Sequence, residues 1–236
     1  MRQPICLTGL IAAGLALPAL TDTQPPHHPT ILPAAAPALI DRAGVYPRAA
    51  RLADGSLVAA YAAPSQADQV LRLARSTDNA TTWAPLGEVA RGAARTHDLD
   101  NAHVVQLPSG RLLYAFRNHD RAGDFPGGAW RYTWYRLTVC ASDDGGRSWR
   151  FASQVEERGA MGVNGLWEPF LRVTKDGSVQ VFYSAESDGA EQDNLMRSSR
   201  DGGMTWSAPL VVSGSGLVSR DGMTGVAEVN GNGTLM

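Results

Sequence analysis

One eight-residue pattern occurs three times in the chain: STDNATTW at Ser76–Trp83, SDDGGRSW at Ser142–Trp149 and SRDGGMTW at Ser199–Trp206. We call these octets box one, box two and box three. In such a turn the aspartate accepts hydrogen bonds from backbone amides, the glycine permits a positive φ, and the tryptophan buries a large ring between neighbouring sheets. The octets therefore predict three equivalent turns with six structural residues: Asp78, Trp83, Asp144, Trp149, Asp201 and Trp206.

Box one departs from the other two at a single important position. It has Ala80 where box two has Gly146 and box three has Gly203. If φ is positive at this position, the alanine costs about 1 kcal/mol of stability.

A second repeated signal is a glycine turn followed by an apolar run. It occurs at Gly55, Gly110, Gly177 and Gly233, at spacings of 55, 67 and 56 residues, and it alternates with the boxes. Strand-like stretches lie between the two signals, at residues 57–61, 70–76, 112–116, 134–142, 179–183 and 194–199. Such a period, with about four short strands in it, is typical of a propeller blade.

The sequence thus predicts an all-β propeller of four-stranded antiparallel blades, with three blades and the first strand of a fourth. Propellers have about four to eight blades. We therefore expect the chain to be a fragment of a longer ring, and to be poorly stable alone because its first and last blades leave strand edges and apolar faces uncovered.

The composition places the protein among ordinary globular proteins. With 44% hydrophobic residues, 19% charged residues and a net charge of −2, it is a poor partner for nucleic acid. Residues 1–20 read as a signal peptide, residues 21–43 as a leader or linker, and residues 44–236 as the partial propeller domain. We expect a secreted, extracellular protein with no membrane attachment after cleavage; the alternative for the apolar start is a disordered tail.

Two further details concern secretion and thiol chemistry. Asn79 and Asn232 each begin a glycosylation sequon. Cys6 lies in the predicted signal peptide, so Cys140 is the one cysteine of the mature chain and is expected to be an inert core thiol.

Residues at equal distance before each glycine turn are expected to ring one mouth of the propeller, opposite the boxes. Nine residues before the turns lie Tyr46, Asn101, Glu168 and Thr224. This mouth is dense in carboxylates, and Trp167 and Trp130 are available to stack on a sugar face; sugar hydrolysis uses one protonated and one ionised carboxyl. Glu168 is the candidate catalytic group. Glu186, Asp188 and Glu191 are interpreted as solvated loop charges.

No metal site or cofactor is predicted from the sequence. His97 and His119 have no paired metal-ligand spacing, so hydrogen bonding to a sugar or a loop is the better interpretation.

Five longer stretches resemble fungal exo-α-1,5-L-arabinanases, glycoside hydrolases of the sialidase superfamily that carry Asp-box (BNR) repeats: YPR at 46–48, THDLDN at 96–101, FRNHD at 116–120, NGLWEPF at 164–170 and RDGMTG at 220–225. The resemblance runs from about Gly44 to the C-terminus. It implies a six-bladed, monomeric enzyme that releases arabinobiose from arabinan with retention.

By this resemblance Glu168 is the acid/base. The substrate-binding residues that it implies are Tyr46, Arg48, His97, Asp98, Asp100, Asn101, Arg117, His119, Asn164, Trp167, Arg220 and Asp221. The family's nucleophile lies on the strand that follows the fourth glycine turn, where this sequence has only Thr234, Leu235 and Met236. The 236-residue chain is therefore expected to be inactive.

Two alternatives remain open at the level of sequence. A sialidase would need an arginine cluster for a carboxylate, of which Arg48 is a candidate member. A non-catalytic, carbohydrate-binding propeller would have the same boxes.

Overall fold

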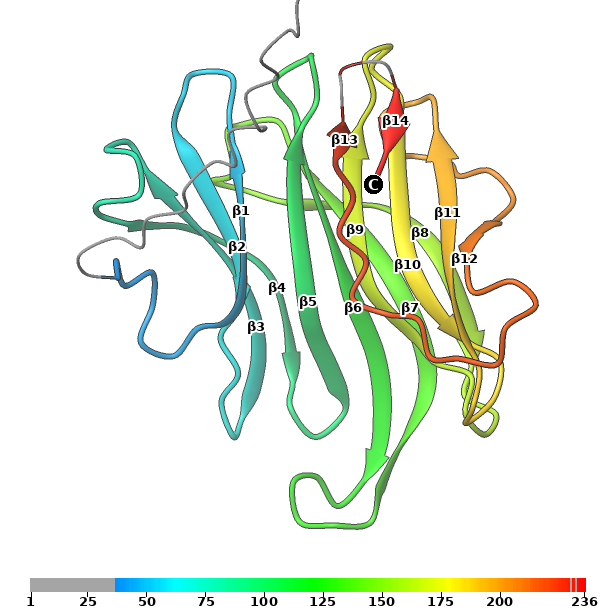
Figure 1. Ribbon diagram of the computed structural model, residues 1–236. Coiled ribbons are helices and arrows are strands. Elements are labelled where there is room, and N and C mark those ends of the chain that lie inside the picture. The colour runs from blue at the N-terminus through cyan, green and yellow to red at the C-terminus, as the bar shows by residue number, and fades with distance from the viewer. Residues whose placement is uncertain (1–36, 230, 232) are drawn as a thin grey trace, which may run out of the picture. The chain divides into compact units, whose positions relative to one another are not determined.

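The computed structural model describes residues 37–229, 231 and 233–236; the predicted signal peptide and most of the leader lie outside these residues. The described part of the chain contains strands and no helix, and so it has no helix that could span a membrane. The strands form three four-stranded antiparallel sheets and one two-stranded sheet, each pairing neighbours in chain order (Figure 1). The prediction of an all-β fold with four-stranded blades is confirmed.

The strand bounds follow the repeat. The first sheet consists of β1 (Val45–Arg51), β2 (Leu57–Ala62), β3 (Asp68–Ser76) and β4 (Ala84–Ala93). The second consists of β5 (His97–Gln106), β6 (Leu112–Gly123), β7 (Trp130–Ser142) and β8 (Arg150–Gly159). The third consists of β9 (Leu166–Val173), β10 (Val179–Glu186), β11 (Gln192–Ser199) and β12 (Leu210–Ser213), and the short fourth of β13 (Glu228–Val229) and β14 (Thr234–Leu235).

Strand register places each glycine turn beside its box. Leu57 pairs with Ser76, Leu112 with Ser142 and Val179 with Ser199, so the turn and the box of each sheet lie at the same end. This end is at the top of Figure 1. Trp167 pairs instead with Ser184, at the other end of the third sheet. Glu168 therefore lies opposite the boxes, as predicted.

The boxes are closed by hydrogen bonds within each octet. In box two, Asp144 accepts bonds from the backbone N–H and the hydroxyl of Ser148 at 2.9 and 2.6 Å, and the Ser142 hydroxyl accepts the N–H of Gly146 at 2.8 Å. Boxes one and three repeat this pattern. Each box tryptophan packs against a hydrophobic cluster of the core, with part of its ring left exposed.

Apolar residues of the second sheet pack on both of its faces. Along β6, Leu112, Tyr114 and Phe116 join a cluster shared with the first sheet, whereas Leu113 and Ala115 join a cluster shared with the third. This alternation is the period of two expected of a strand between two sheets. Cys140 lies in the first cluster, and burial raises its pKa to about 11, in keeping with an inert thiol.

The segment before the first strand is also packed. Residues 38–236 form one compact unit, and within it Asp41 accepts hydrogen bonds from the Tyr61 hydroxyl at 3.0 Å and from Arg72 at 3.3 Å. Part of the segment that the sequence assigned to a linker therefore belongs to the folded unit.

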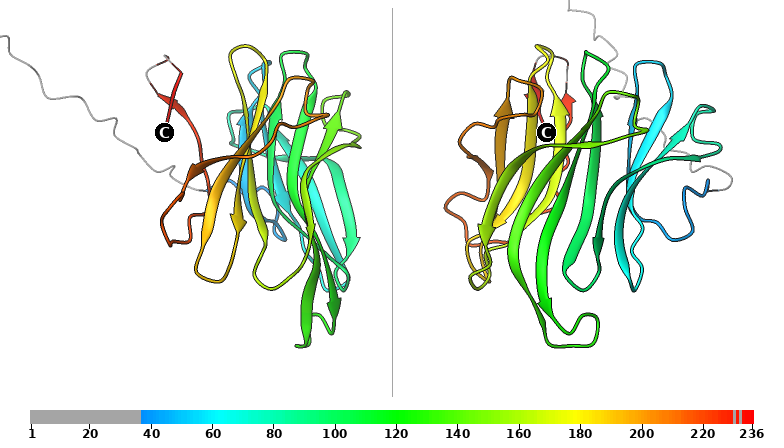
Figure 2. Two further views of the ribbon diagram at one scale, coloured as in Figure 1. Left: turned by 90° about the vertical axis from the view of Figure 1, so that its right-hand side faces the viewer. Right: turned by 180° about the vertical axis from the view of Figure 1, so that it is seen from behind.

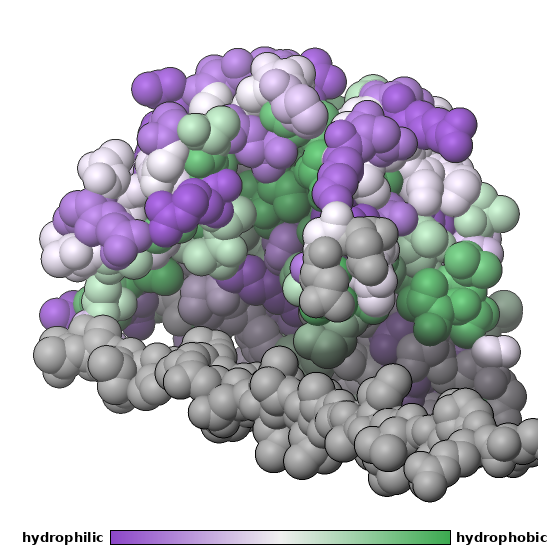
Figure 3. Space-filling model, turned by 45° about the horizontal axis from the view of Figure 1, so that its top comes forward, coloured by the Kyte–Doolittle hydropathy of each residue, from purple (hydrophilic) through white to green (hydrophobic). Residues whose placement is uncertain are grey.

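The far side of the third sheet is covered by the chain after β12. Arg220 forms a parallel bridge with Gln192, and Glu228 of β13 forms an ion pair with Arg172 of β9 at 2.9 Å. Figure 2 shows the β13–β14 pair beside this sheet. Apolar side chains nevertheless remain exposed at β12 and in the following loop: Leu210, Val211, Val212, Leu217 and Val218. In Figure 3 green apolar surface is visible in the central hollow and at the lower right, and purple hydrophilic surface covers much of the top of the view.

Candidate functional site

The inner strand of each complete sheet carries the same irregularity. Between Val45 and Arg48, Asp100 and His103, and Trp167 and Phe170, three residue steps face only two on the partner strand. Each stretch is a β-bulge with one extra residue, a device that redirects a side chain. Its second residue has a positive φ: 51° at Tyr46, 52° at Asn101 and 57° at Glu168.

These three bulges confirm that the residues nine positions before the turns are equivalent. The fourth repeat deviates by one residue, since the positive φ of 54° belongs to Met223 and not to Thr224. A left-handed conformation at a non-glycine residue costs about 1–3 kcal/mol and is concentrated at functional sites. The bulges therefore mark the end of the sheets at which ligand chemistry is expected.

Glu168 is half-buried and faces the segment that crosses the third sheet. Its Oε2 accepts the backbone N–H of Met223 at 2.5 Å. Arg48 of β1 donates to the Pro169 carbonyl at 3.0 Å, linking the first and third inner strands. Burial lowers the pKa of Arg48, and the charges of Glu168 and Asp100 oppose this shift. One arginine thus interacts with two carboxylates on different strands.

A second charged group comes from the middle sheet. Arg117 of β6 lies 3.2 Å from Asp98 and 3.4 Å from Asp100, and Tyr132 donates its hydroxyl to Asp98 at 2.5 Å. Burial raises the pKa of Asp100, while Arg117 acts in the opposite direction. The guanidinium of Arg117 also lies 5.3 Å from the Trp167 ring. The charges near Glu168 are therefore paired and fixed in position.

Trp167 is held by aromatic neighbours and by a glycine. A Cβ at Gly165 would lie 2.4 Å from the indole, so only glycine leaves room for this ring. His119 is fully buried, with its ring centroid 5.4, 4.9 and 5.2 Å from Tyr132, Tyr135 and Trp167. Its Nδ1 accepts the N–H of Arg136 at 3.2 Å, and burial lowers its pKa to about 2. His119 is thus a neutral support for the rings and has no surface to offer a sugar.

Four other residues suggested by the sequence brace loops. His97 contacts the Thr96 hydroxyl at 2.8 Å, and Asn164 bonds to the backbone of Met161 and Gly159 at 2.9 and 3.0 Å. Asp221 accepts hydroxyls from Ser213 and Ser219 at 2.6 and 2.9 Å, which lower its pKa.

Arg220, the fourth, bonds to Glu186 and, at 3.2 Å, to Gln192. Glu186 is buried, and it also accepts the N–H of Gly165 at 2.9 Å. Its interpretation as a solvated loop charge is therefore wrong: it anchors the loop that leads into Trp167 and Glu168.

The sequence did not indicate Tyr132 or His103. Tyr132 lies on β7, outside the spacing that relates the inner strands. His103 follows the Asn101 bulge, accepts the N–H of Leu171 at 3.2 Å and stacks on Phe170 at 4.2 Å. Its position two residues after the expected bulge at Asn101 is the sequence signal that could have indicated His103.

The sheets form consecutive four-stranded blades, with the box turns at one end and the bulges of the inner strands at the other. No protein-family model matches the chain, and no curated protein matches it.

Solved structures of other proteins share this fold. The α-L-arabinofuranosidase of Fusarium graminearum in complex with arabinobiose has a TM-score of 0.60 at 23% identity, over 78% of this chain and 53% of that one. The Penicillium chrysogenum α-L-arabinanase complexed with arabinobiose has a TM-score of 0.55 at 24% identity, over 75% and 52%. A Hadza microbial sialidase has a TM-score of 0.50 at 18% identity, over 70% and 36%. The chain spans about half the length of the first two, and these likenesses establish the fold.

Proposed function

We propose that this chain carries the acid/base residue, Glu168, of a glycoside hydrolase that acts on the ends of arabinan. The observation that carries the proposal is the position of Glu168 on a strained bulge, opposite the boxes and beside Trp167. Strain of this kind persists where the surrounding structure fixes a side chain for a purpose.

The surroundings of Glu168 suit a neutral sugar. Retaining hydrolysis uses one carboxyl to protonate the leaving oxygen and a second to attack the anomeric carbon, about 5–5.5 Å away. Glu168 supplies the first role. Arg48, Asp98 and Asp100 offer hydrogen bonds to sugar hydroxyls, and the Trp167 ring offers a face for C–H groups.

The arginines argue against a sialidase. A sialidase needs a cluster of arginines free to hold a carboxylate, but here Arg117 is paired with Asp98 and Asp100. Arg220 is paired with Glu186. The relatives complexed with arabinobiose support arabinan as the substrate class.

Calorimetric titration with arabinobiose and, separately, with N-acetylneuraminic acid tests the proposal. We expect arabinobiose to bind, the acidic sugar not to bind, and Trp167→Ala to weaken arabinobiose binding about tenfold through the lost stacking surface. Asp176→Asn, a turn residue at the box end, is the matched control and leaves binding unchanged. Binding of the acidic sugar alone would overturn the proposal in favour of a sialidase.

Turnover separates an enzyme from a binding module. Arabinobiose release from linear arabinan needs both carboxyl roles, of which Glu168 fills one. In a form extended by the further blades that the resemblance implies, we expect turnover, and Glu168→Gln lowers it about 10²–10⁴-fold. An extended form that binds arabinobiose without hydrolysing arabinan would identify a non-catalytic binder.

A further inference from the structure

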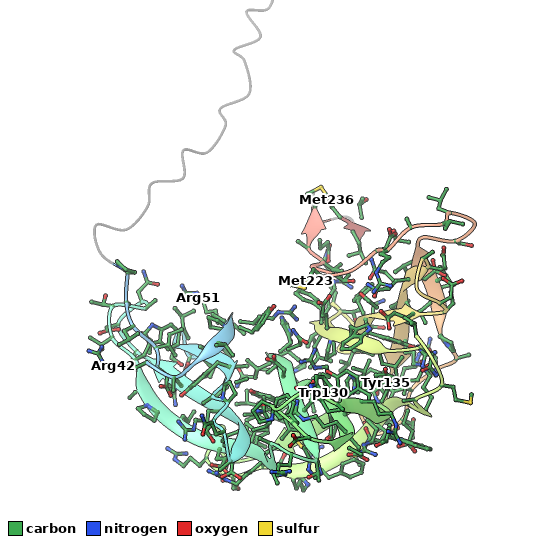
Figure 4. All side chains as sticks on the ribbon, turned by 90° about the horizontal axis from the view of Figure 1, so that it is seen from below. Arg42, Arg51, Trp130, Tyr135, Met223 and Met236 are labelled. Atoms are coloured by element: carbon green, nitrogen blue, oxygen red, sulfur yellow. The ribbon has the colours of Figure 1, made fainter. Side chains whose placement is uncertain are left out.

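A recess lies near the Glu168 region, along β7 of the second sheet and the loop that follows β8. It measures about 670 Å³ and is lined by Trp130, Tyr132 and Tyr135 of β7 and by Ala160 and Gly162 of the loop after β8. Its volume falls in the range of about 300–1,000 Å³ that is typical of small-molecule sites. Figure 4 shows Trp130 and Tyr135 in the view from the end of the sheets that carries Glu168.

The recess is continuous with the candidate catalytic region through aromatic rings. The ring centroid of Trp167 lies 5.8 Å from Tyr132, and that of Tyr132 lies 5.2 Å from Trp130. Tyr135 closes the wall, 5.9 Å from Trp167. An aromatic surface thus runs from the neighbour of Glu168 outward to Trp130.

These rings are fixed by partners beneath them. The Tyr132 hydroxyl donates to Asp98 at 2.5 Å. Arg121 is buried, donates to the Ala94 carbonyl at 2.7 Å, and places its guanidinium 5.5 Å from the Trp130 ring. Rings held in this way lose little conformational entropy when a ligand binds.

The rim of the recess is polar. Arg131 and Thr133 line it with exposed side chains that can donate or accept hydrogen bonds. Aromatic walls with a few polar groups suit a neutral ligand that has both C–H faces and hydroxyls. That ligand chemistry is a sugar unit.

We propose that this recess binds arabinofuranosyl units of the substrate chain beyond the bond that is cleaved. This inference rests on the proposed function, since it assumes that the chain end is held beside Glu168. With the terminal disaccharide there, the rest of an arabinan chain follows the aromatic surface past Trp167 to Trp130. The protein then distinguishes long chains from short ones.

The test compares the affinities of arabinobiose and linear arabinopentaose by calorimetry. The unaltered chain is expected to bind the pentaose about tenfold more tightly than the disaccharide. Trp130→Ala removes this advantage and leaves arabinobiose affinity unchanged. Trp134→Ala is the matched control, because Trp134 is 38% exposed on the same strand and does not line the recess, and it leaves both affinities unchanged.

A second variant guards against misfolding of the first. Thr133→Gln places a larger neutral side chain in the recess from an exposed position and is expected to lower pentaose affinity alone. If neither Trp130→Ala nor Thr133→Gln changes pentaose affinity, or if Trp134→Ala lowers it equally, the inference is overturned while the proposed function stands. If neither sugar binds the unaltered chain, both fail.

Discussion

The two ends of the sheets are built in different ways. At the box end, Asp144 is bonded only to neighbours within its own octet, at Ser142, Arg147 and Ser148. At the other end, Glu168 bonds to Met223, 55 residues away, and Arg48 reaches Pro169, 121 residues away. Local bonds repeat whenever the octet repeats, whereas each of these distant bonds joins one pair of segments. Box three adds one distant bond, since its Gly203 carbonyl accepts the Ser153 hydroxyl, 50 residues away. The box end is therefore held chiefly by bonds within each octet, and the Glu168 end by bonds between distant segments.

The two ends also differ in how their titratable groups are shifted. At the boxes, hydrogen bonds from Thr82 and Thr205 lower the pKa values of Asp78 and Asp201 to about 2. Near Glu168, burial lowers the pKa of His103 to about 3 and that of His119 to about 2. The ends should therefore lose stability in different pH ranges.

The largest expected effect is the acid sensitivity contributed by the two histidines. Both are held neutral in the folded state, while the unfolded chain protonates them below about pH 6.5. Their contribution is complete above pH 6.5 and is lost as the pH falls toward 3, by roughly 3 kcal/mol per histidine at pH 4. The contribution of the box carboxylates is also lost as the pH falls, but only at lower pH, between about pH 4 and 2. Urea unfolding at pH 7, 5 and 4 measures the difference.

Asparagine variants assign this sensitivity to the histidines. In His103→Asn and His119→Asn, the amide oxygen can accept the N–H that Nδ1 accepts now, from Leu171 and Arg136. Each variant should flatten the loss of stability between pH 7 and 4. An unchanged slope in both would mean that the sensitivity has another source.

The next effect separates packing from backbone strain at the box end. A Cβ at Gly146 would lie 2.7 Å from Leu73 and 3.1 Å from Leu86, at a φ of 93°. Gly146→Ala should therefore cost about 3 kcal/mol through both strain and overpacking. Gly145→Ala is the control: its φ is 74° but the nearest atom is 3.8 Å away, so it should cost only about 1 kcal/mol. Equal losses would show that packing plays no part.

A smaller effect has the opposite sign and concerns box one. Ala80 has a φ of 69°, as the comparison of the three boxes required. Ala80→Gly should raise the free energy of unfolding by about 1 kcal/mol. Ala84→Gly, at an exposed position in β4, is the control and should lower it by about 0.5–1 kcal/mol. A loss of stability at Ala80 would show that its methyl group packs well enough to offset the strain.

The difference between the ends explains what could be predicted from the sequence. The turns at Gly55, Gly110 and Gly177 were found because each depends on a few adjacent residues. The equivalence of Tyr46, Asn101 and Glu168 followed from counting back from those turns. The contacts of Tyr132 and Glu186 were missed because they depend on which strands become neighbours in space, and no local spacing records that.

The smallest effect tests whether strain at the Glu168 end serves binding. Tyr46 has a φ of 51° but is 52% exposed, so it has little packing to lose. Tyr46→Gly should raise the free energy of unfolding by about 0.5 kcal/mol, and Tyr46→Asn by less, because asparagine tolerates this conformation better than tyrosine does and less well than glycine. If the ring contacts substrate, both variants weaken arabinobiose binding while they stabilise the fold. Denaturant unfolding and arabinobiose titrations of the same samples measure both quantities. Stabilisation with unchanged binding would mean that the bulge of β1 serves no ligand. A loss of stability would mean that the packing of the Tyr46 ring outweighs its backbone strain.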